Sequence, residues 1–207
     1  MTNVVVVGTS GHARVCIDTL RAIGYAVVGC VGGAPCGAMD VPHLGGDECL
    51  ATLVAHTPAA FVAVGDNLTR QRLFALAASM GFDLVSAVHP SAVISPSAHL
   101  GSNVLVVAGS VINAYARLDD GVIVNTGASV DHDCHIHAFA HVAPGARLAG
   151  NVELGEGAFV GVGASVTPGR RVGAWSIVGA GAAVIRDVAD GHTVVGVPAI
   201  SRLRDEQ

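Results

Sequence analysis

The second part of the chain repeats a hydrophobic position every six residues. From Val88 to Val184 each sixth residue is Val, Ile or Leu, without an exception. A second row, two residues before the first, holds small residues, with Arg170 as the single large one. A period of six fits neither an α-helix nor a simple alternating strand. It predicts a solenoid of triangular cross-section, in which each hexapeptide forms one short parallel strand and one corner and both rows point inward.

The first part of the chain follows a different pattern, in which short apolar runs alternate with amphipathic segments. Strands are expected at 4–7, 26–31 and 60–64, and helices at 13–23, 47–56 and 70–80. Alternating strands and helices predict a small parallel α/β domain. We therefore divide the chain into a Rossmann-like domain, residues 1–85, and a β-helix domain with a C-terminal tail, residues 86–207.

Composition narrows the classes of function. The net charge is −5 and the 11 Lys and Arg residues form no basic cluster, which argues against a nucleic-acid partner. No apolar run approaches the ~18 residues that a membrane span needs, and the run 4–7 lacks the basic region of a signal peptide. The five cysteines are an odd number without a CxxC pair, so we expect reduced thiols and a cytoplasmic protein.

Residues 130–145, VDHDCHIHAFAHVAPG, concentrate four of the ten histidines. Cys134 falls in the small inward row and is expected to be buried packing. His132 lies between two inward positions, where the coil turns, and Gly150 holds the same position one coil of 18 residues later. Stacking then places His132 roughly 5 Å from the Gly150 backbone. A base beside a bare backbone N–H suits acyl transfer, which needs proton removal and an oxyanion donor.

The other histidines of this stretch are expected on different sides of the prism. His141 lies nine residues beyond His132, half a coil away, so the two imidazoles can share a pocket only if one comes from a neighbouring chain. His135 and His137 are interpreted as solvated surface. A zinc site needs three or four ligands that converge on one point. Because these histidines are expected in different columns and on different faces, we predict no metal.

A glycine turn follows the first strand, in the segment Gly8-Thr9-Ser10-Gly11-His12. A turn of this kind that opens a helix exposes backbone N–H groups that suit a phosphate. By itself the signal is weak, because the same turn also serves simply to tighten a strand-to-helix junction.

Together these motifs resemble the bacterial sugar O-/N-acyltransferase family. The resemblance covers nearly the whole chain, from VVVVGTSGHARVCIDTL through FVAVGDNLTRQRL and HPSAVISPSA to VVGVPA. It is densest in NTGASVDHDCHIHAFAHVAPGARLAGNVELG. It implies a left-handed parallel β-helix of hexapeptide repeats, assembled as a homotrimer. It also implies acetyl-CoA as the donor and a nucleotide-linked amino sugar of glycan biosynthesis as the acceptor.

The resemblance also implies roles for individual residues. The catalytic residues would be His132 as general base, Asp133 as its acidic partner and Gly150 as the oxyanion donor. The acetyl-CoA site would include His141, Val162 and Ala180, and the nucleotide-sugar pocket Ser10, Gly11, His12 and Gly65. Asp131 is a rival partner for His132, since in a straight strand neither aspartate would easily face the imidazole.

Three functions remain open at this stage. We favour direct N-acetylation of an amino sugar from acetyl-CoA. The alternatives are O-acetylation of sialic acid or a related sugar, which the same base could catalyse, and a non-catalytic nucleotide-sugar-binding scaffold. The segment CVGGAPCG places Gly32 and Gly33 where such enzymes commonly carry acidic residues, which leaves the nucleotide undetermined.

Overall fold

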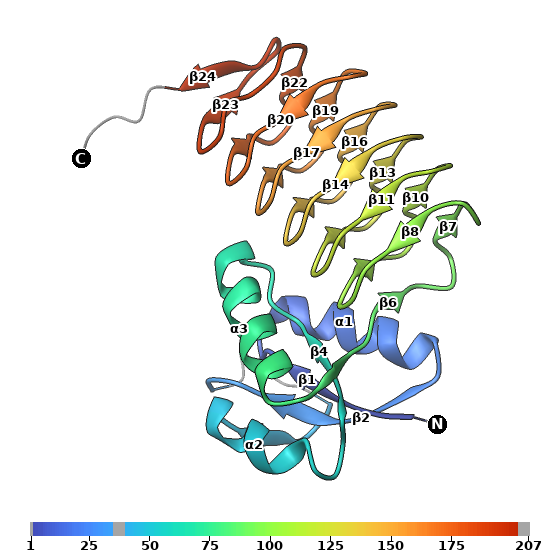
Figure 1. The fold of residues 1–207 in the computed structure, drawn as a ribbon, viewed down its shortest axis with the longest axis vertical. Helices are drawn as coiled ribbons and strands as arrows, with labels where there is room; N and C mark the ends of the chain where they lie inside the picture. The colour runs from blue at the N-terminus through green and yellow to red at the C-terminus, as the bar shows by residue number, and fades with distance from the viewer. Residues whose placement is uncertain (1, 35–39, 203–207) are drawn as a thin grey trace.

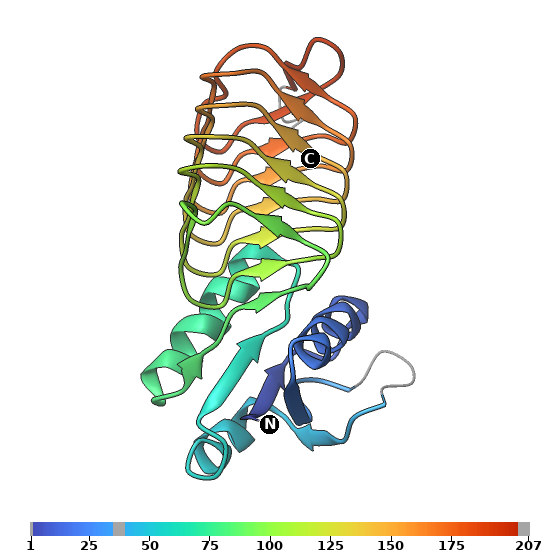
Figure 2. The same ribbon diagram turned by 90° about the vertical axis from the view of Figure 1, so that its right-hand side faces the viewer.

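The computed structural model describes residues 2–34 and 40–202, except for the side chain of Arg202. Cys36 lies outside the described residues. An N-terminal α/β domain sits at one end of a long β-helix, whose coils stack away from it toward the C-terminus (Figures 1 and 2). No helix in the described part of the chain is long and apolar enough to cross a membrane.

The N-terminal domain has one parallel sheet of five strands in the order β3-β2-β1-β4-β5. The strands are β1 (Thr2–Val7), β2 (Tyr25–Val31), β3 (His43–Gly45), β4 (Ala59–Val62) and β5 (Asp83–Leu84). The helices are α1 (Gly11–Ala22), the 3₁₀ turn η1 (Asp47–Cys49), α2 (Leu50–Leu53) and α3 (Asn67–Ser79). The predicted α/β class is confirmed.

Two of the helices differ from the sequence-based expectation. The segment expected to be helical at 47–56 contains only η1 and the single turn of α2. Helix α3 begins at Asn67, before the expected residue 70, because the Asp66 carboxylate caps it and accepts a hydrogen bond from the Thr69 N–H at 2.8 Å.

The β-helix has three parallel faces, and it is left-handed as the resemblance implied. Face 1 contains β6 (Ala87–Val88), β9 (Leu105–Val106), β12 (Ile123–Val124), β15 (His141–Val142), β18 (Phe159–Val160), β21 (Ile177–Val178) and β23 (Thr193–Val195), with β24 (Ile200–Arg202) antiparallel at its end. Face 2 contains β7 (Val93–Ile94), β10 (Val111–Ile112), β13 (Ser129–Val130), β16 (Arg147–Leu148), β19 (Ser165–Val166) and β22 (Ala183–Val184). Face 3 contains β8 (His99–Leu100), β11 (Arg117–Leu118), β14 (His135–Ile136), β17 (Glu153–Leu154) and β20 (Arg171–Val172).

The core of the β-helix consists of the two rows that the sequence predicted. Apart from the partly exposed Arg170, the aliphatic and small rows from Val104 to Val184 are buried and form one continuous core, and Cys134 is 1% exposed within it. Only the first coil, with Val88, Ile94 and Leu100, is partly open. Rows of small and aliphatic side chains fill the narrow prism and leave no room for aromatic rings.

Helix α1 joins the two domains through apolar packing. One side of the helix covers the β1 sheet, and the same cluster includes Leu105 and Ile123 from the outer surface of face 1. In a free-standing β-helix these outward residues would be exposed, but here they are 0% and 1% exposed. Helices α2 and α3 cover the opposite side of the sheet. The first coils of face 1 are therefore an interface between the domains.

A buried guanidinium fastens helix α3 to the β-helix. Arg70 is 1% exposed, and it donates to the carbonyls of Gly121 at 2.8 Å and Phe139 at 2.6 Å on the β-helix side. It also donates to the carbonyls of Val64 at 3.0 Å and Gly65 at 3.1 Å in the loop after β4. Burial lowers the pKa of Arg70 to about 10, so the group stays charged at neutral pH. One side chain thus holds the Gly65 loop against the coils.

We predict that Arg70→Ala destabilises the protein by at least ~3 kcal/mol, because several buried carbonyls lose their charged donor and a cavity is left. Urea unfolding followed by circular dichroism measures the change. Arg72→Ala is the matched control on the same helix, where the side chain is 63% exposed and a change within about 0.5 kcal/mol is expected. Equal effects of the two substitutions would contradict the proposed fastening role.

Candidate active site

The corner between β13 and β14 brings an imidazole and a carboxylate together. Asp133 has a φ of 58°, in the left-handed region, and its N–H donates to the Ala114 carbonyl of the coil below at 3.0 Å. This turn directs the Asp133 carboxylate to Nδ1 of His132 at 2.8 Å. Asp131 instead accepts from the backbone N–H of His132 at 2.7 Å and from the Asn113 amide at 2.9 Å. Asp133, not Asp131, is therefore the partner of the ring.

The electrostatics of this corner favour a basic imidazole. The hydrogen bond to Asp133 raises the pKa of His132, and the charge of the nearby Asp131 acts in the same direction. With Nδ1 directed at a carboxylate, that nitrogen carries the ring proton and Nε2 keeps its lone pair. The side chain of His132 is 59% exposed, so Nε2 is accessible to a substrate.

Gly150 lies directly against this ring, one coil above. A Cβ atom at this position would be 2.5 Å from both Cε1 and Nε2 of His132, so only glycine leaves space for the imidazole. The Gly150 carbonyl accepts from Gly169 at 3.0 Å, and the following N–H, of Asn151, donates to the His132 carbonyl at 2.8 Å. None of the hydrogen bonds found within residues 2–34 and 40–202 uses the N–H of Gly150 itself. A base and a free backbone donor thus share one corner.

His141 lies on a different face and in a different environment. It belongs to β15 on face 1, is 7% exposed, and its Nε2 is 3.2 Å from the Asn125 amide nitrogen. The Asn125 oxygen accepts from Thr126, so the amide NH₂ donates to His141 and leaves the proton on Nδ1. Nδ1 is buried and makes no hydrogen bond of standard geometry within the described residues, although the Gly65 backbone lies near enough to the ring to act on its pKa in the raising direction. A buried donor of this kind needs an acceptor, which a ligand can supply.

His141 is close to the predicted nucleotide-sugar residues. Its ring centroid is 6.3 Å from that of His12, and His12 in turn lies near Gly65. Burial, followed by the charge of Arg70, lowers the pKa of His141 to about 3 and that of His12 to about 4. Both rings are therefore neutral at cellular pH. The structure brings His12, Gly65 and His141 together at the domain junction, away from His132.

Two clefts flank the Gly65 loop. The first, of about 290 Å³, lies at the carboxyl ends of β1, β2 and β4. It is lined by Val7, Gly8, Thr9, Ser10, Val31, Gly32, Gly33, Asp47, Val64, Thr69, Arg72 and Leu73. The second, of about 300 Å³, lies between the start of α3 and face 1, and it includes Phe159, Trp175 and Ile177. The edge formed by the carboxyl ends of parallel strands is the usual ligand site of such sheets.

The first cleft also holds a carboxylate that the sequence pattern did not reveal. Gly32 and Gly33 line it where an acidic residue was expected, and Asp47 lies in the same cleft from the 3₁₀ turn. Asp47 approaches Arg72 at 3.8 Å, which gives this cleft one acidic and one basic group. Its position in the sequence, after a loop, gave no periodic signal that could have identified it.

Val162 and Ala180 occupy one corner, between faces 1 and 2, in successive coils. The Gly181 N–H donates to the Val162 carbonyl at 2.8 Å, which stacks the two corners. Both side chains are exposed. This corner is separate from that of His132, which joins faces 2 and 3. Within one chain, the full width of face 2 therefore separates His132 from Val162 and Ala180.

The expectation that His135 and His137 lie on different faces was wrong. They flank the inward Ile136 on β14, so both side chains point outward from face 3, with ring centroids 3.9 Å apart. Asp119 joins them from the coil below. The missed signal was the spacing of 18 residues between Asp119 and His137, the same spacing that pairs His132 with Gly150.

Comparison with known proteins agrees with this architecture. Residues 3–76 match the family model of the PglD N-terminal domain. The structure of PerB from Caulobacter crescentus, in complex with CoA and GDP-perosamine, is similar over 98% of both chains, with 48% identity and a TM-score of 0.95. Another structure of that organism's protein is described as a perosamine N-acetyltransferase variant.

A second relative carries the same architecture in another organism. The acetyltransferase domain of PglB from Neisseria gonorrhoeae shares 38% identity over 98% of this chain and 100% of that chain, with a TM-score of 0.92. It has also been solved in complex with acetyl coenzyme A. These matches span essentially the full length of the chain, and the chain belongs to the bacterial sugar acyltransferase family of hexapeptide-repeat enzymes.

Proposed function

We propose that this protein is an acetyl-CoA-dependent N-acetyltransferase that acts on the amino group of a nucleotide-linked amino sugar. The observation that supports it most directly is the His132 ring, held by Asp133 at 2.8 Å and packed on the bare backbone of Gly150. This pair supplies the base and the oxyanion donor that acyl transfer requires. The bound CoA and GDP-perosamine of the similar PerB support the donor and acceptor classes.

The proposed reaction is a direct transfer without a covalent enzyme intermediate. The amine attacks the thioester carbonyl, and Nε2 of His132 accepts the proton that the amine loses. The Gly150 N–H donates to the oxygen on which negative charge develops. When the carbon–sulfur bond breaks, the CoA sulfur leaves and takes up a proton, which the imidazolium can return. Asp133 stabilises that imidazolium by its hydrogen bond to Nδ1.

The substrate groups are assigned to the remaining candidate residues. We propose that Ser10, Gly11, His12 and Gly65 form part of the nucleotide-sugar pocket. His141 contributes its unpartnered Nδ1–H to a bound acceptor atom, and Val162 and Ala180 line the path of acetyl-CoA. The similarity to PerB makes GDP-linked 4-amino sugars the first acceptors to test. N-acetylation is favoured over O-acetylation because the named activity of that relative is on an amine.

The proposal includes a homotrimer in the cytoplasm. The corners of His132 and of Val162 with Ala180 are both exposed in the single chain and lie at opposite edges of face 2. A neighbouring prism would supply the second wall of a CoA groove and bring a face 1 residue such as His141 toward His132. The free thiols of Cys16, Cys30, Cys49 and Cys134 are compatible with a reducing compartment.

The proposed function is tested by steady-state acetyl transfer from acetyl-CoA to GDP-perosamine, with the matching 4-hydroxy sugar as the second acceptor. We expect transfer to the amine, and His132→Ala should lower kcat at least ~10²-fold because the general base is lost. His56→Ala is the control, because His56 is an exposed histidine of the N-terminal domain that belongs to neither proposed site. Near-normal turnover of His132→Ala would remove this residue from its role. Transfer to the hydroxyl alone would assign O-acetylation, and failure to bind CoA would indicate a scaffold.

The role of Asp133 predicts a change in pH dependence. The Asp133 hydrogen bond raises the pKa of His132, so Asp133→Asn should lower it toward 6.5. Because the neutral ring is the active form, the acid limb of kcat/KM should move to lower pH while the plateau rate falls. Asp131→Asn is the matched control and should move the limb less, since Asp131 contacts the backbone N–H and not the ring. An acid limb that does not move in Asp133→Asn would contradict this assignment.

The contact between Gly150 and His132 predicts that a single methyl group added at residue 150 strongly lowers kcat. Gly150→Ala places a Cβ where the imidazole lies, so the ring is displaced and kcat should fall roughly 10²-fold. A double-mutant cycle with His132→Ala measures the coupling. If the methyl acts through the ring, Gly150→Ala should add little in the His132→Ala background. Fully additive losses would show that the methyl acts elsewhere.

A further inference from the structure

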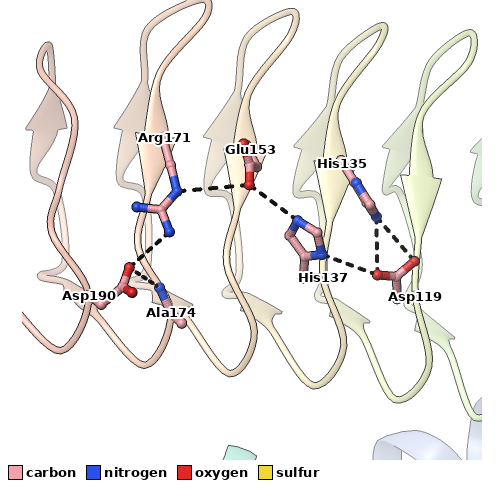
Figure 3. A network of polar contacts seen from close by, with 7 residues as sticks. All are labelled: Asp119, His135, His137, Glu153, Arg171, Ala174 and Asp190. Atoms are coloured by element: carbon pink, nitrogen blue, oxygen red, sulfur yellow. Dashed lines mark hydrogen bonds and ion pairs between the residues drawn. The ribbon is translucent and has the colours of Figure 1, made fainter.

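A cluster of side chains that are able to bind a metal lies on face 3, outside the proposed active site (Figure 3). His135 projects from β14, His137 from the position directly after it, and Asp119 from the turn after β11, one coil below. One ligand atom from each of these three residues can be chosen so that all lie within 4.8 Å of one another. The proposed transfer reaction uses none of these groups.

The distances between the ligand atoms of these three residues fit the tetrahedral coordination of a metal ion. Nε2 of His135 is 3.1 Å from Oδ2 of Asp119, and Nδ1 of His137 is 3.4 Å from the same oxygen. With zinc bonds of 2.0–2.2 Å, neighbouring ligand atoms of a tetrahedral site lie about 3.4 Å apart. The side chains are 33–42% exposed, so an ion and a water in the fourth position can reach them.

A second carboxylate orients one of the histidines. Nε2 of His137 lies 3.3 Å from Oε1 of Glu153 on β17, while Nδ1 of the same ring faces Asp119. Metal-bound imidazoles usually donate their other N–H to a carboxylate, which fixes the tautomer and raises the basicity of the ligand. Glu153 has this position relative to His137.

Two cationic side chains lie near this cluster: Arg117, which is paired with His135 from the coil below, and Arg171, which is already engaged by acidic groups. Arg171 approaches Glu153 at 3.9 Å and donates to Asp190 at 3.0 Å (Figure 3). Its guanidinium is therefore directed along the face and away from Asp119. The cluster offers two imidazoles and one carboxylate to an ion, and the Irving–Williams order favours the later divalent metals for such nitrogen-rich sites.

We propose that Asp119, His135 and His137 form a Zn²⁺ site, with Glu153 as the hydrogen-bond acceptor of His137. Ligands from two successive coils, and the acceptor from a third, would then be tied together on face 3. The expected consequence is stabilisation of these coils by Zn²⁺, because an ion that binds only the folded chain shifts unfolding to higher temperature. This site is independent of the proposed transferase function.

The test is isothermal titration of the untagged, chelator-treated full-length protein with ZnCl₂, together with Co²⁺ titration followed by visible spectroscopy. One Zn²⁺ per chain and a Co²⁺ spectrum with nitrogen and oxygen ligands are expected. Asp119→Asn and His137→Asn should each abolish binding, and Glu153→Gln should weaken it about tenfold. His99→Asn is the matched control, because His99 occupies the same column of face 3 as His135, two coils below.

Thermal unfolding gives a readout that does not depend on activity. Zn²⁺ should raise Tm of the wild type and of His99→Asn, and leave Asp119→Asn unchanged. No Zn²⁺ binding to the wild type would overturn the proposal. Binding that survives in both Asp119→Asn and His137→Asn would also overturn it, since the ion would then sit elsewhere, for example at His132. Circular dichroism at low temperature shows that each variant is folded before titration.

Discussion

The stacking of one coil on the next, through parallel backbone hydrogen bonds at a spacing of 18 residues, positions the polar groups of the β-helix on which the proposed chemistry depends. The register is maintained from Val93 paired with Val111 to Val166 paired with Val184. Each inward aliphatic residue therefore lies above another, and each corner lies above an equivalent corner. A side chain on one coil meets the residue 18 positions later, so contacts between neighbouring coils can be read from the residue numbers.

The same register between coils produces two different polar sites. At the corner of faces 2 and 3, the partner of His132 one coil later is a glycine, which leaves the ring space and a bare N–H. On face 3, the partner of Asp119 one coil later is His137, which brings a carboxylate to an imidazole. A third pairing lies on face 1, between Ile123 and His141. Ile123 belongs to the apolar cluster that packs on α1, whereas His141, one coil later, faces the polar residue His12.

The two proposed active-site histidines illustrate how environment separates chemically identical groups. His132 is exposed and held by a carboxylate, so its pKa is raised and it suits proton transfer. His141 is buried near Arg70 and His12, so its pKa falls to about 3 and it stays a neutral hydrogen-bond donor. The charge of Arg70 is tolerated because backbone carbonyls surround it, and the same contacts set the Gly65 loop beside His141. The junction of the two domains and the proposed ligand site thus share the Arg70 side chain and its contacts.

The sequence by itself determined the β-helix, its inward rows and the proximity of His132 to Gly150, because a constant repeat with backbone pairing allows one register. The parallel α/β class of the first domain followed from its alternating pattern in the same way. Only the tertiary structure decided which aspartate holds His132, since that depends on the left-handed φ of Asp133 at the corner. It also decided that Asp47 lies in the first cleft and that Arg70 and His141 meet the Gly65 loop, because neither contacts between loops nor contacts between domains have a period along the chain.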